Sequence, residues 1–533
     1  WWRSRGGPCS IIVLIACGLP GTASKVGLGT FVDPRLEGGK IGSKTTEDLV
    51  SVIQLGGKEL LYYKAMPISV AFIRGTSADA EGNITMERET LTQDMLAIAT
   101  ATKNSGGFVI AQVERIAERG SLNPRRVKVP GILVDCVVVA EKPEYHMQTF
   151  VEQYSPAFAG EIKVPMSAIA AMPMSERKII ARRAALELKS NAVVNLGIGM
   201  PEGVANVATE ENVIDLLTLT AEPGVIGGVP AGGLSFGAAT NAQAIIDQPS
   251  QFDFYQGGGL DITFLGLAQA DQQGNLNVSK FGPRLAGAGG FIDISQNAKK
   301  VVFVGTFTAG NLEVAVNAGK LQILEDGKAK KFVAEVEHRT FSGSQAAKWG
   351  KTVLYVTERC VFKLTTEGLE LIEIAPGIDL QKDILDKMDF KPIMHKEPAL
   401  MDARIFSDEP MGIRSAMLEM PLEERLSYDA AKNVFFVNFA GMNVRTEADI
   451  TRILEAVESQ LAPIGHKVNA IVNYDRFSIV PELVDDYIGM VKGVMERHYH
   501  DVTRYTSSTF LRMKLGDALE KRALAPHLYE SAD

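Results

Sequence analysis

Residues 217 to 237 place one acidic side chain, Glu222, between an apolar run and a loop rich in glycine. The run from Leu217 to Ala221 has the composition of a buried strand, and Pro223-Gly224 ends it. Glu222 is therefore expected at the carboxyl end of a strand, the edge at which ligands bind in open α/β sheets. A Glu before Pro-Gly is also common in solvated turns, so this position alone does not assign a catalytic role.

The glycines that follow Glu222 remove side chains where another molecule could approach the backbone. They are Gly224, Gly227, Gly228, Gly232, Gly233 and Gly237. A second glycine run, Gly257-Gly258-Gly259, follows the segment Phe252-Asp253-Phe254-Tyr255-Gln256. We expect the two loops and the carboxylate to form one ligand site; the alternative is that these glycines only make turns.

Glu222-Pro223-Gly224-x-x-Gly227-Gly228, followed by Gln251–Tyr255 and Gly257–Gly259, is similar to class I coenzyme A transferases, in their acetate/propionate (short-chain acyl-CoA:acetate/3-ketoacid) branch. Three further stretches carry the same resemblance, which covers roughly residues 25 to 412: Gly29–Arg35, Gly289–Ile294 and Ile374–Leu380. No single stretch is specific, but their combination is.

The resemblance implies an enzyme that transfers CoA between a short-chain acyl-CoA and a carboxylic acid such as acetate or propionate. Glu222 would be the covalent nucleophile of a ping-pong reaction through a glutamyl-CoA thioester. CoA is then a substrate, and neither a metal nor a permanently bound cofactor is expected. Gly227, Gly228 and Gly257 to Gly259 are the expected CoA-binding glycines. The alternatives are an acyl-CoA hydrolase on the same scaffold and a non-catalytic, ligand-binding homologue.

A further glycine turn lies upstream, where the predicted strand Ala192–Leu196 runs into Gly197-Ile198-Gly199 and then a helix. A strand, a glycine turn and a helix N-terminus can bind an anion. The spacing is not the dinucleotide fingerprint, so NAD is not expected. Gly197 and Gly199 are either a tight packing turn or a wall of the CoA or acyl pocket.

An internal repeat predicts the architecture. Residues 70–84 echo residues 262–276, each as a strand, an Ala-Asp-x-x-Gly-Asn turn and a second strand. Downstream, residues 106–113 stand where residues 299–306 stand. The fold class is therefore α/β, with two tandem open α/β halves.

The domain organisation follows from this repeat. Residues 25–150 form a first CoA-transferase domain, residues 151–174 a linker, and residues 175–411 the domain that carries Glu222. Residues 1–24 are atypical and suggest a truncated or frame-shifted start. The first half lacks the opening strand–turn–helix unit that the resemblance implies, so we expect an exposed sheet edge or core face and weak or no activity. Residues 412–533 form an additional small α/β domain.

This last domain loosely resembles a STAS-type module. Its expected elements are strands 433–439, 467–473 and 501–505 and helices 447–461, 481–499 and 509–521. It contains no catalytic constellation, so a structural role is expected, with ligand sensing as the weaker alternative.

Composition excludes several classes of protein. The 55 Lys and Arg against 64 Asp and Glu give a net charge of −9, which argues against a nucleic-acid binder. The apolar run Ile11–Leu19 is too short to span a bilayer, so no membrane partner is expected. The four cysteines have no metal-ligand spacing and indicate a reducing, cytoplasmic location. The seven histidines form no ligand set, and His146 is expected to be exposed in the connecting stretch from residue 141 to residue 173. Tandem α/β enzymes of this size commonly form homo-oligomers.

Overall fold

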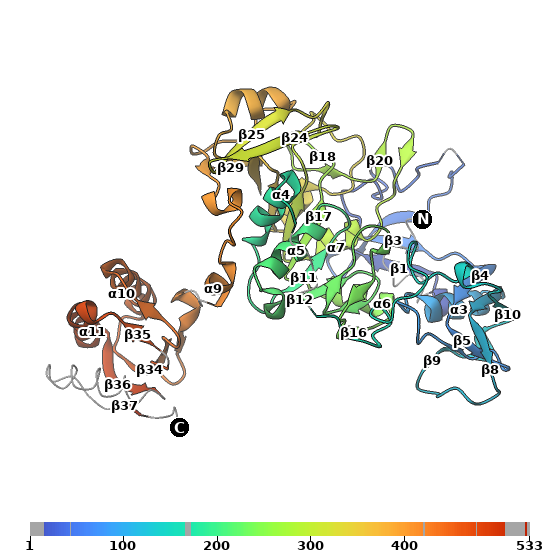
Figure 1. Ribbon diagram of the computed structural model, residues 1–533, viewed down its shortest axis with the longest axis horizontal. Helices are drawn as coiled ribbons and strands as arrows, with labels where there is room; N and C mark the ends of the chain where they lie inside the picture. The colour runs from blue at the N-terminus through green and yellow to red at the C-terminus, as the bar shows by residue number, and fades with distance from the viewer. Residues whose placement is uncertain are drawn as a thin grey trace. The chain divides into compact units, whose positions relative to one another are not determined.

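The computed structural model describes residues 15–42, 44–165, 172–418, 422–475, 477–506 and 528–529. The chain forms two compact units, residues 1–413 (unit 1) and residues 414–533 (unit 2). Both tandem halves lie in unit 1, and unit 2 begins close to the expected boundary at residue 412. Figure 1 shows the elements of both units. The predicted helix 509–521 and the first 14 residues lie outside the described residues.

The second half of unit 1 is built on a ten-stranded sheet in the order β16-β13-β12-β11-β17-β22-β27-β28-β29-β30. The five strands β12, β11, β17, β22 and β27 are parallel neighbours, as an open α/β fold requires. The bounds are β11 (Val193–Leu196), β12 (Thr218–Ala221), β13 (Val225–Ile226), β16 (Ala244–Ile245), β17 (Ile262–Gly266), β22 (Lys300–Val304), β27 (Thr352–Val356), β28 (Cys360–Thr365), β29 (Gly368–Ile374) and β30 (Ala399–Leu400). These strands confirm the predicted runs at 192–196, 217–221 and 299–306.

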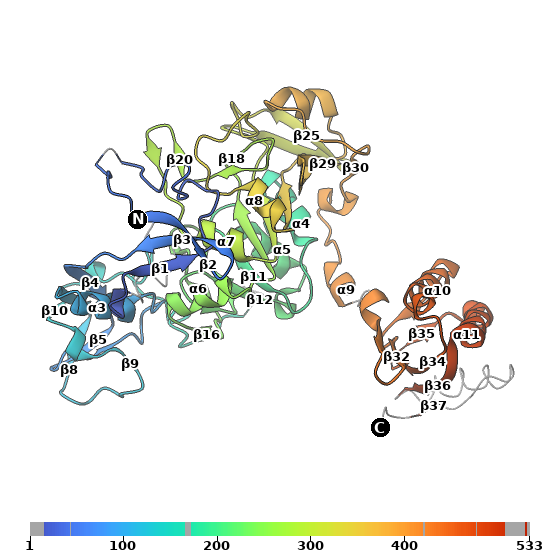
Figure 2. The ribbon, with the colours of Figure 1, turned by 180° about the vertical axis from the view of Figure 1, so that it is seen from behind.

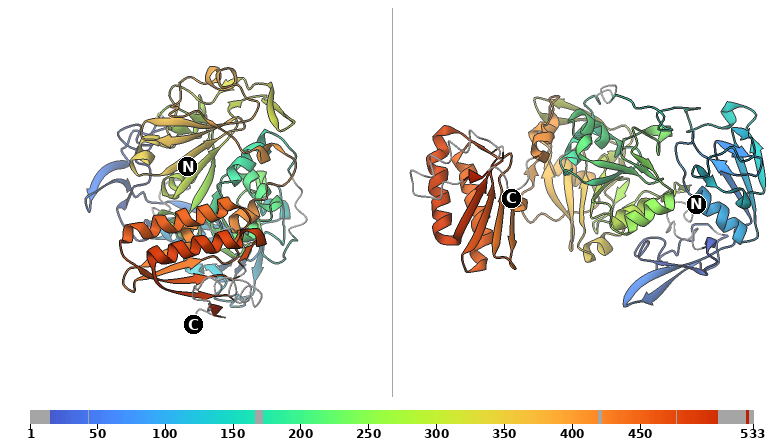
Figure 3. Two further views of the ribbon diagram at one scale, coloured as in Figure 1. Left: turned by 90° about the vertical axis from the view of Figure 1, so that its left-hand side faces the viewer. Right: turned by 90° about the horizontal axis from the view of Figure 1, so that it is seen from below.

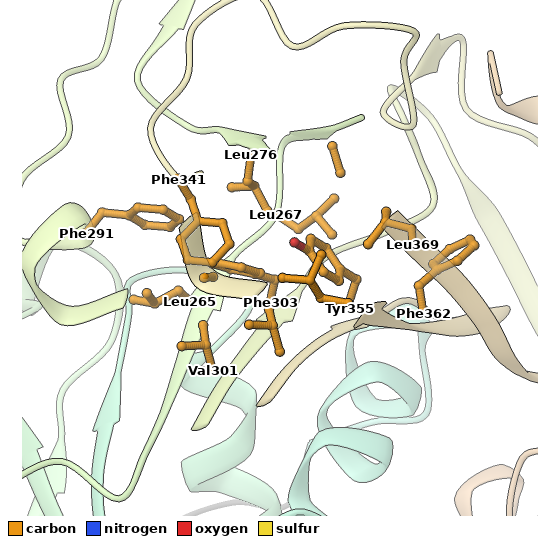
Figure 4. Packing of buried hydrophobic residues seen from close by; sticks show 14 of the residues in the cluster. Leu265, Leu267, Leu276, Phe291, Val301, Phe303, Phe341, Tyr355, Phe362 and Leu369 are labelled. Atoms are coloured by element: carbon orange, nitrogen blue, oxygen red, sulfur yellow. The ribbon is translucent and has the colours of Figure 1, made fainter. Parts of the chain in front are cut away.

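Several helices pack on this sheet, and some helices also pack on each other. α4 (Glu176–Ala185) lies against β22 and β27, and α5 (Glu202–Glu210) lies against β11. α6 (Gln248–Gln256) and α7 (Phe291–Asn297) pack on each other and α7 on β17, while α8 (Gly343–Lys348) lies against β28. Figure 4 shows the aromatic cluster beside α7, where Phe291, Phe303, Phe341 and Tyr355 lie in a row. This cluster packs α7 against the sheet of the second half.

The first half repeats part of this plan. Its sheet has the order β10-β7-β4 with all strands parallel, and α3 packs on β4 and β7. A second sheet, β8-β5-β6-β9, holds the hairpin that follows β4. The bounds are β4 (Val70–Arg74), β5 (Ser77–Asp79), β6 (Ile84–Thr85), α3 (Met95–Asn104), β7 (Phe108–Val113), β8 (Arg115–Ala117), β9 (Val127–Val129) and β10 (Cys136–Val139). Figure 2 shows these elements gathered at the N-terminal end of unit 1.

The repeat is confirmed at the level of single hydrogen bonds. The Asp79 carboxylate accepts from the backbone N–H and side-chain amide of Asn83, whose Oδ1 accepts from Gly131 N at 2.9 Å. Asp271, Asn275 and Gly343 repeat the same set, with Gly343 N at 3.1 Å from Asn275 Oδ1. Gly is required at both positions, because a Cβ there would lie 2.0 Å from a carbonyl oxygen of the turn. Each Asp-x-x-Gly-Asn turn therefore binds a glycine far along the chain, and the two contacts are equivalent in the two halves.

One face of the β10-β7-β4 sheet is apolar and exposed. Phe72 is 77% exposed, while Val70, Phe108 and Val138 are each close to half exposed. The alternate residues of the same strands, such as Ile73 and Val109, are buried under α3. Among the described residues, one face of this sheet is therefore covered by α3 and the other is open.

The remaining strands of unit 1 form one three-stranded sheet and several antiparallel pairs. β1 (Gly21–Ser24), β3 (Lys58–Lys64) and β2 (Val50–Leu55) form an antiparallel sheet. The segment after β1 is bound to α7, since Gln296 accepts from Gly27 N and donates to Leu28 O. The small antiparallel pairs are β14 (Val229–Pro230) with β15 (Ala239–Thr240), β18 (Gln269–Ala270) with β19 (Leu276–Asn277), β20 (Lys280–Phe281) with β21 (Arg284–Leu285), β23 (Thr308–Ala309) with β26 (Ala329–Lys330), and β24 (Glu313–Asn317) with β25 (Lys320–Glu325).

Unit 2 has a five-stranded sheet in the order β31-β32-β34-β36-β37. Figure 3 shows α10 and α11 side by side over the sheet. The bounds are α9 (Ile413–Leu418), β31 (Leu426–Asp429), β32 (Val434–Asn438), β33 (Asn443–Val444), α10 (Glu447–Leu461), β34 (Val468–Asn473), β35 (Ser478–Ile479), α11 (Val484–His498), β36 (Tyr499–Tyr505) and β37 (Leu528–Tyr529). A capping box of Thr446 and Asp449 starts α10 at the predicted residue. No helix among the described residues of either unit is long and apolar enough to cross a membrane.

Candidate active site

Glu222 lies at the carboxyl tip of β12, as the sequence predicts. A tight turn follows, in which Gly224 N donates to Ala221 O at 3.0 Å before β13 returns antiparallel. Gly224 has a φ of +116°, and a Cβ there would lie 1.9 Å from Ile246 O. The Glu222 side chain is half-buried. The turn therefore holds one carboxylate at the ligand-binding edge of the sheet.

The backbone before α7 packs directly against this carboxylate. A Cβ at Gly290 would lie 2.2 Å from Glu222 Oε2 and 2.9 Å from Cζ of Phe252. Gly289 adopts a left-handed φ of +54° just before it. Gly289–Ile294 is one of the stretches that carry the family resemblance, but its contact with Glu222 was not predicted from the sequence. The signal was a glycine pair immediately before a helix.

A layer of buried polar side chains lies next to Glu222. Tyr255 donates from its hydroxyl to Thr220 Oγ1 at 2.8 Å, and Thr220 donates to Val194 O at 3.0 Å. Asn195, on the neighbouring strand, lies within 3.4 Å of the same Tyr255 hydroxyl. Burial, and also the charge of Glu222, raise the pKa of Tyr255 to about 12. Tyr255 is therefore a neutral hydrogen-bond donor at physiological pH.

The first half reaches the loop that carries Glu222. A Cβ at Gly237 would lie 3.4 Å from Cγ of Pro223 and 3.5 Å from Cδ1 of Leu91, so these three residues meet. The end of the first half, just before the linker, also contacts the glycine loop, where the hydroxyls of Thr149 and Ser235 are 3.1 Å apart. The first half thus forms one wall beside Glu222.

The predicted glycines Gly197 and Gly199 lie at the same sheet edge as Glu222, directly after β11. Gly199 has a φ of +84°, and its N–H donates to Glu202 Oε1 at 3.0 Å. A cavity of about 430 Å³ lies beside this turn. Its lining includes Arg177, Gly197, Glu202, Asn206, Pro230 and Phe236. This turn can therefore border a bound ligand.

Gly227 and Gly228 serve the packing of the chain on itself. A Cβ at Gly227 would lie 2.5 Å from Cγ of Gln243, and one at Gly228 would lie 2.3 Å from Thr240 O. Both glycines have positive φ. They let β13, β14 and the return strand β15 stack closely behind Glu222.

Gly257, Gly258 and Gly259 do not meet Glu222. They turn α6 into the amino end of β17, whereas Glu222 follows the carboxyl end of β12, which runs in the same direction two positions away in the sheet. The prediction that the two glycine loops lie together is therefore wrong. The loops lie at opposite ends of parallel strands, so the length of a strand separates them. A role for these glycines in binding CoA stays a prediction.

His146 is buried, not exposed as expected. Its Nε2 lies 2.8 Å from Glu89 Oε1 and its Nδ1 lies 3.1 Å from Nε2 of Gln112. Glu89 also pairs with Arg74 at 2.9 Å. This network ties the segment around His146 to the first-half sheet, a tertiary contact that local polarity does not reveal. Among the described residues, no group of three His, Cys, Asp or Glu side chains could hold a metal ion.

Comparisons with known proteins bear on the family of this chain. A family model described as "Coenzyme A transferase" matches residues 3–140. The chain is 53% identical over 408 residues to caffeate CoA-transferase of Acetobacterium woodii, an alignment that covers 76% of this chain and 78% of that protein. The chain belongs to the coenzyme A transferase family. Acetate CoA-transferase YdiF of Escherichia coli K12 is 47% identical over 394 residues, with 74% of each chain covered.

A solved structure gives the same result for the fold of this transferase. The thioester complex with CoA of the acyl-CoA transferase YdiF from E. coli O157:H7 superposes with a TM-score of 0.71 at 45% identity, covering 76% of each chain. The α/β architecture predicted from the sequence is confirmed.

Proposed function

We propose that this chain transfers CoA between a short-chain acyl-CoA and a carboxylic acid such as acetate or propionate, with Glu222 as the covalent nucleophile. The observation that carries the proposal is the pairing of a half-buried carboxylate at the tip of β12 with the bare backbone of Gly290. Two related proteins are an acetate CoA-transferase and a caffeate CoA-transferase, which supports this reaction type.

The reaction needs only groups that this site offers. An oxygen of Glu222 attacks the thioester carbonyl carbon, and the carbon–sulfur bond breaks to give an acyl anhydride and CoA thiolate. The thiolate then attacks the Glu222 carbonyl, and the acyl group leaves as its carboxylate. A second carboxylate reverses these steps and leaves with CoA. Gly289 and Gly290 allow backbone groups to come within reach of the oxyanions that form.

Isotope transfer tests the proposal directly. The chain is incubated with acetyl-CoA and acetate labelled with ¹⁸O, and the peptide that contains Glu222 is analysed by mass spectrometry. Transfer through the anhydride leaves one acceptor oxygen on Glu222, whereas the Glu222→Gln variant should stay unlabelled. Label from H₂¹⁸O without any need for acetate would instead support the hydrolase alternative. No label from either source, with acyl-CoA still bound, would support the non-catalytic alternative.

Labelling needs only single turnovers, so it is independent of the expectation that this chain is weakly active. Steady-state exchange between acetyl-CoA and propionate tests that expectation separately. We further propose a cytoplasmic location and a homo-oligomer. The free thiols of Cys17, Cys136 and Cys360 support the first, and the exposed apolar face around Phe72 supports the second.

A further inference from the structure

A second carboxyl group lies on α7, the helix that begins right after the glycine that meets Glu222. Asp293 is in the first turn of α7, three residues after Gly290, and its side chain is fully buried. Its Oδ2 accepts from Gln256 Nε2 at 2.7 Å, and its Oδ1 accepts from Asn297 Nδ2 at 2.8 Å. Both partners are neutral amides. No Lys or Arg pairs with Asp293 among the residues that the structure describes.

The charged and titratable groups that act on Asp293 come from three other elements. Glu222 opposes its ionisation from the turn after β12, and Lys25 favours it from the segment after β1. Burial, and then the charge of Asp293, raise the pKa of Tyr63 of β3. Burial, which outweighs the two amide hydrogen bonds, and the charge of Glu222 raise the pKa of Asp293 to about 7.

The internal repeat shows that the fold does not require an acid here. In the first half, Gln93 is left-handed (φ +48°) and Asp94 caps α3, just as Gly289 (φ +54°) and Gly290 precede α7. The third residue of α3 is then Ala97, where α7 has Asp293. The half that carries the candidate nucleophile therefore has a buried carboxyl group at a position where its repeat has a methyl group.

We propose that Asp293 is a positioning residue that exchanges charge with Glu222: it tends to be neutral while Glu222 is ionised, and it ionises when Glu222 becomes the CoA thioester. This inference rests on the proposed function. The net step converts Glu222 carboxylate and acyl-CoA into glutamyl-CoA thioester and free carboxylate. Asp293 then releases its proton to solvent, because the repulsion from Glu222 has disappeared. The buried charge of the site is thereby kept near one.

A stability cycle tests the coupling without any turnover. Folding favours the protonated form of the Asp293 carboxyl group. The contribution of this group to the free energy of unfolding is therefore present at low pH and is lost as pH rises toward about 7. The thermal midpoint of the full chain is measured from pH 5 to 8 for the parent, Asp293→Asn, Glu222→Gln and the double variant. The difference between parent and Asp293→Asn should vary with pH up to about 7. In the Glu222→Gln background this variation should end at least half a pH unit lower, about a threefold change in proton affinity.

An identical pH dependence in the two backgrounds would overturn the proposal, whether or not the chain transfers CoA. Asp293→Ala, which copies Ala97 of the first half, replaces Asp293→Asn if that variant does not fold. Asp253→Asn, on the exposed side of α6, is the matched control and should leave the coupling unchanged.

The thioester equilibrium gives a second measurement. Between pH 6 and 8 the conversion of Glu222 and acetyl-CoA into glutamyl-CoA and acetate takes up no proton from the reagents, so any pH dependence belongs to the protein. We expect the equilibrium constant to rise about threefold over this range in the parent and to stay within the error of the assay in Asp293→Asn. If no thioester forms, the proposed function fails while the stability cycle still decides the role of Asp293.

Discussion

The carboxylate of Glu222 occupies the space that a side chain at residue 290 would fill. A Cβ at Gly290 would lie 2.2 Å from Glu222 Oε2, closer than any real Cβ contact. The two residues are far apart in the sequence, yet the turn after β12 and the loop before α7 bring them together at one sheet edge. The proposed nucleophile thus packs against backbone. Backbone has no side-chain rotamers, so this contact cannot be lost by a rotamer change at residue 290.

Gly290→Ala should displace Glu222. The added methyl group meets both the Glu222 carboxylate and the Phe252 ring, so the carboxylate must move by roughly an ångström. A shift of this size lowers the rate of a positioned reaction by about a hundredfold. The measurement is the rate of ¹⁸O labelling at Glu222. Gly42→Ala is the control, because a Cβ at Gly42 meets only Thr45 Oγ1 at 3.9 Å. Unchanged labelling in Gly290→Ala would contradict the assigned contact.

Asn83→Ala and Asn275→Ala should destabilise unit 1 to similar extents. Each removes the side-chain hydrogen bond to an Asp carboxylate and leaves a glycine N–H, at Gly131 or Gly343, without its acceptor. Losing such a buried partner costs about 1–3 kcal/mol. Urea unfolding of the full chain measures the change, and Asn123→Ala, on an exposed loop, should have little effect. A cost in only one half would show that the two turns are not equivalent.

Phe72→Ser should reduce self-association with little loss of stability. Phe72 is 77% exposed on an apolar sheet face, so its ring contributes little to the folded core. Light scattering against protein concentration should show smaller particles, and the unfolding midpoint should change little. Phe303→Ser is the contrast, because Phe303 is fully buried and its truncation should cost at least about 3 kcal/mol. Unchanged association in Phe72→Ser would exclude this face as the contact surface.

Glu458→Gln should destabilise unit 2 only above acidic pH. Burial would raise the pKa of Glu458, but bonds from Arg497 and His498 more than offset this and lower it. A lowered folded pKa gives stability that is present above the unfolded pKa, about 4.3, and is lost as pH falls through the folded pKa. Unfolding of unit 2 should show a loss of about 1 kcal/mol at pH 7 that shrinks as pH falls through the lowered pKa of Glu458.

Glu496→Gln, on the same pair of helices, is the control for that prediction. Glu496 is exposed, and its Oε1 lies as far as 4.0 Å from Lys492 Nζ. A gap between Glu458→Gln and the parent that is equal at pH 7 and pH 3 would mean that charge does not stabilise the α10–α11 contact.

Local patterns in the sequence predicted the elements of this protein and the position of Glu222 on them. The alternation of apolar strands and turn residues placed β11, β12, β22 and α10 within one or two residues of their observed bounds, because such elements depend on neighbours in the chain. The repeated Asp-x-x-Gly-Asn turn predicted the tandem halves for the same reason.

Only the tertiary structure decided which loops share a site with Glu222. Gly257 to Gly259 are closer to Glu222 in sequence than Gly290 is, but they lie at the opposite end of parallel strands. Likewise the polar surroundings of His146 in the chain predicted exposure, while Glu89 and Gln112 bury it. The strand direction and the packing of α7 against β17 decide which glycines lie near Glu222. Neither can be predicted from the residues next to Glu222.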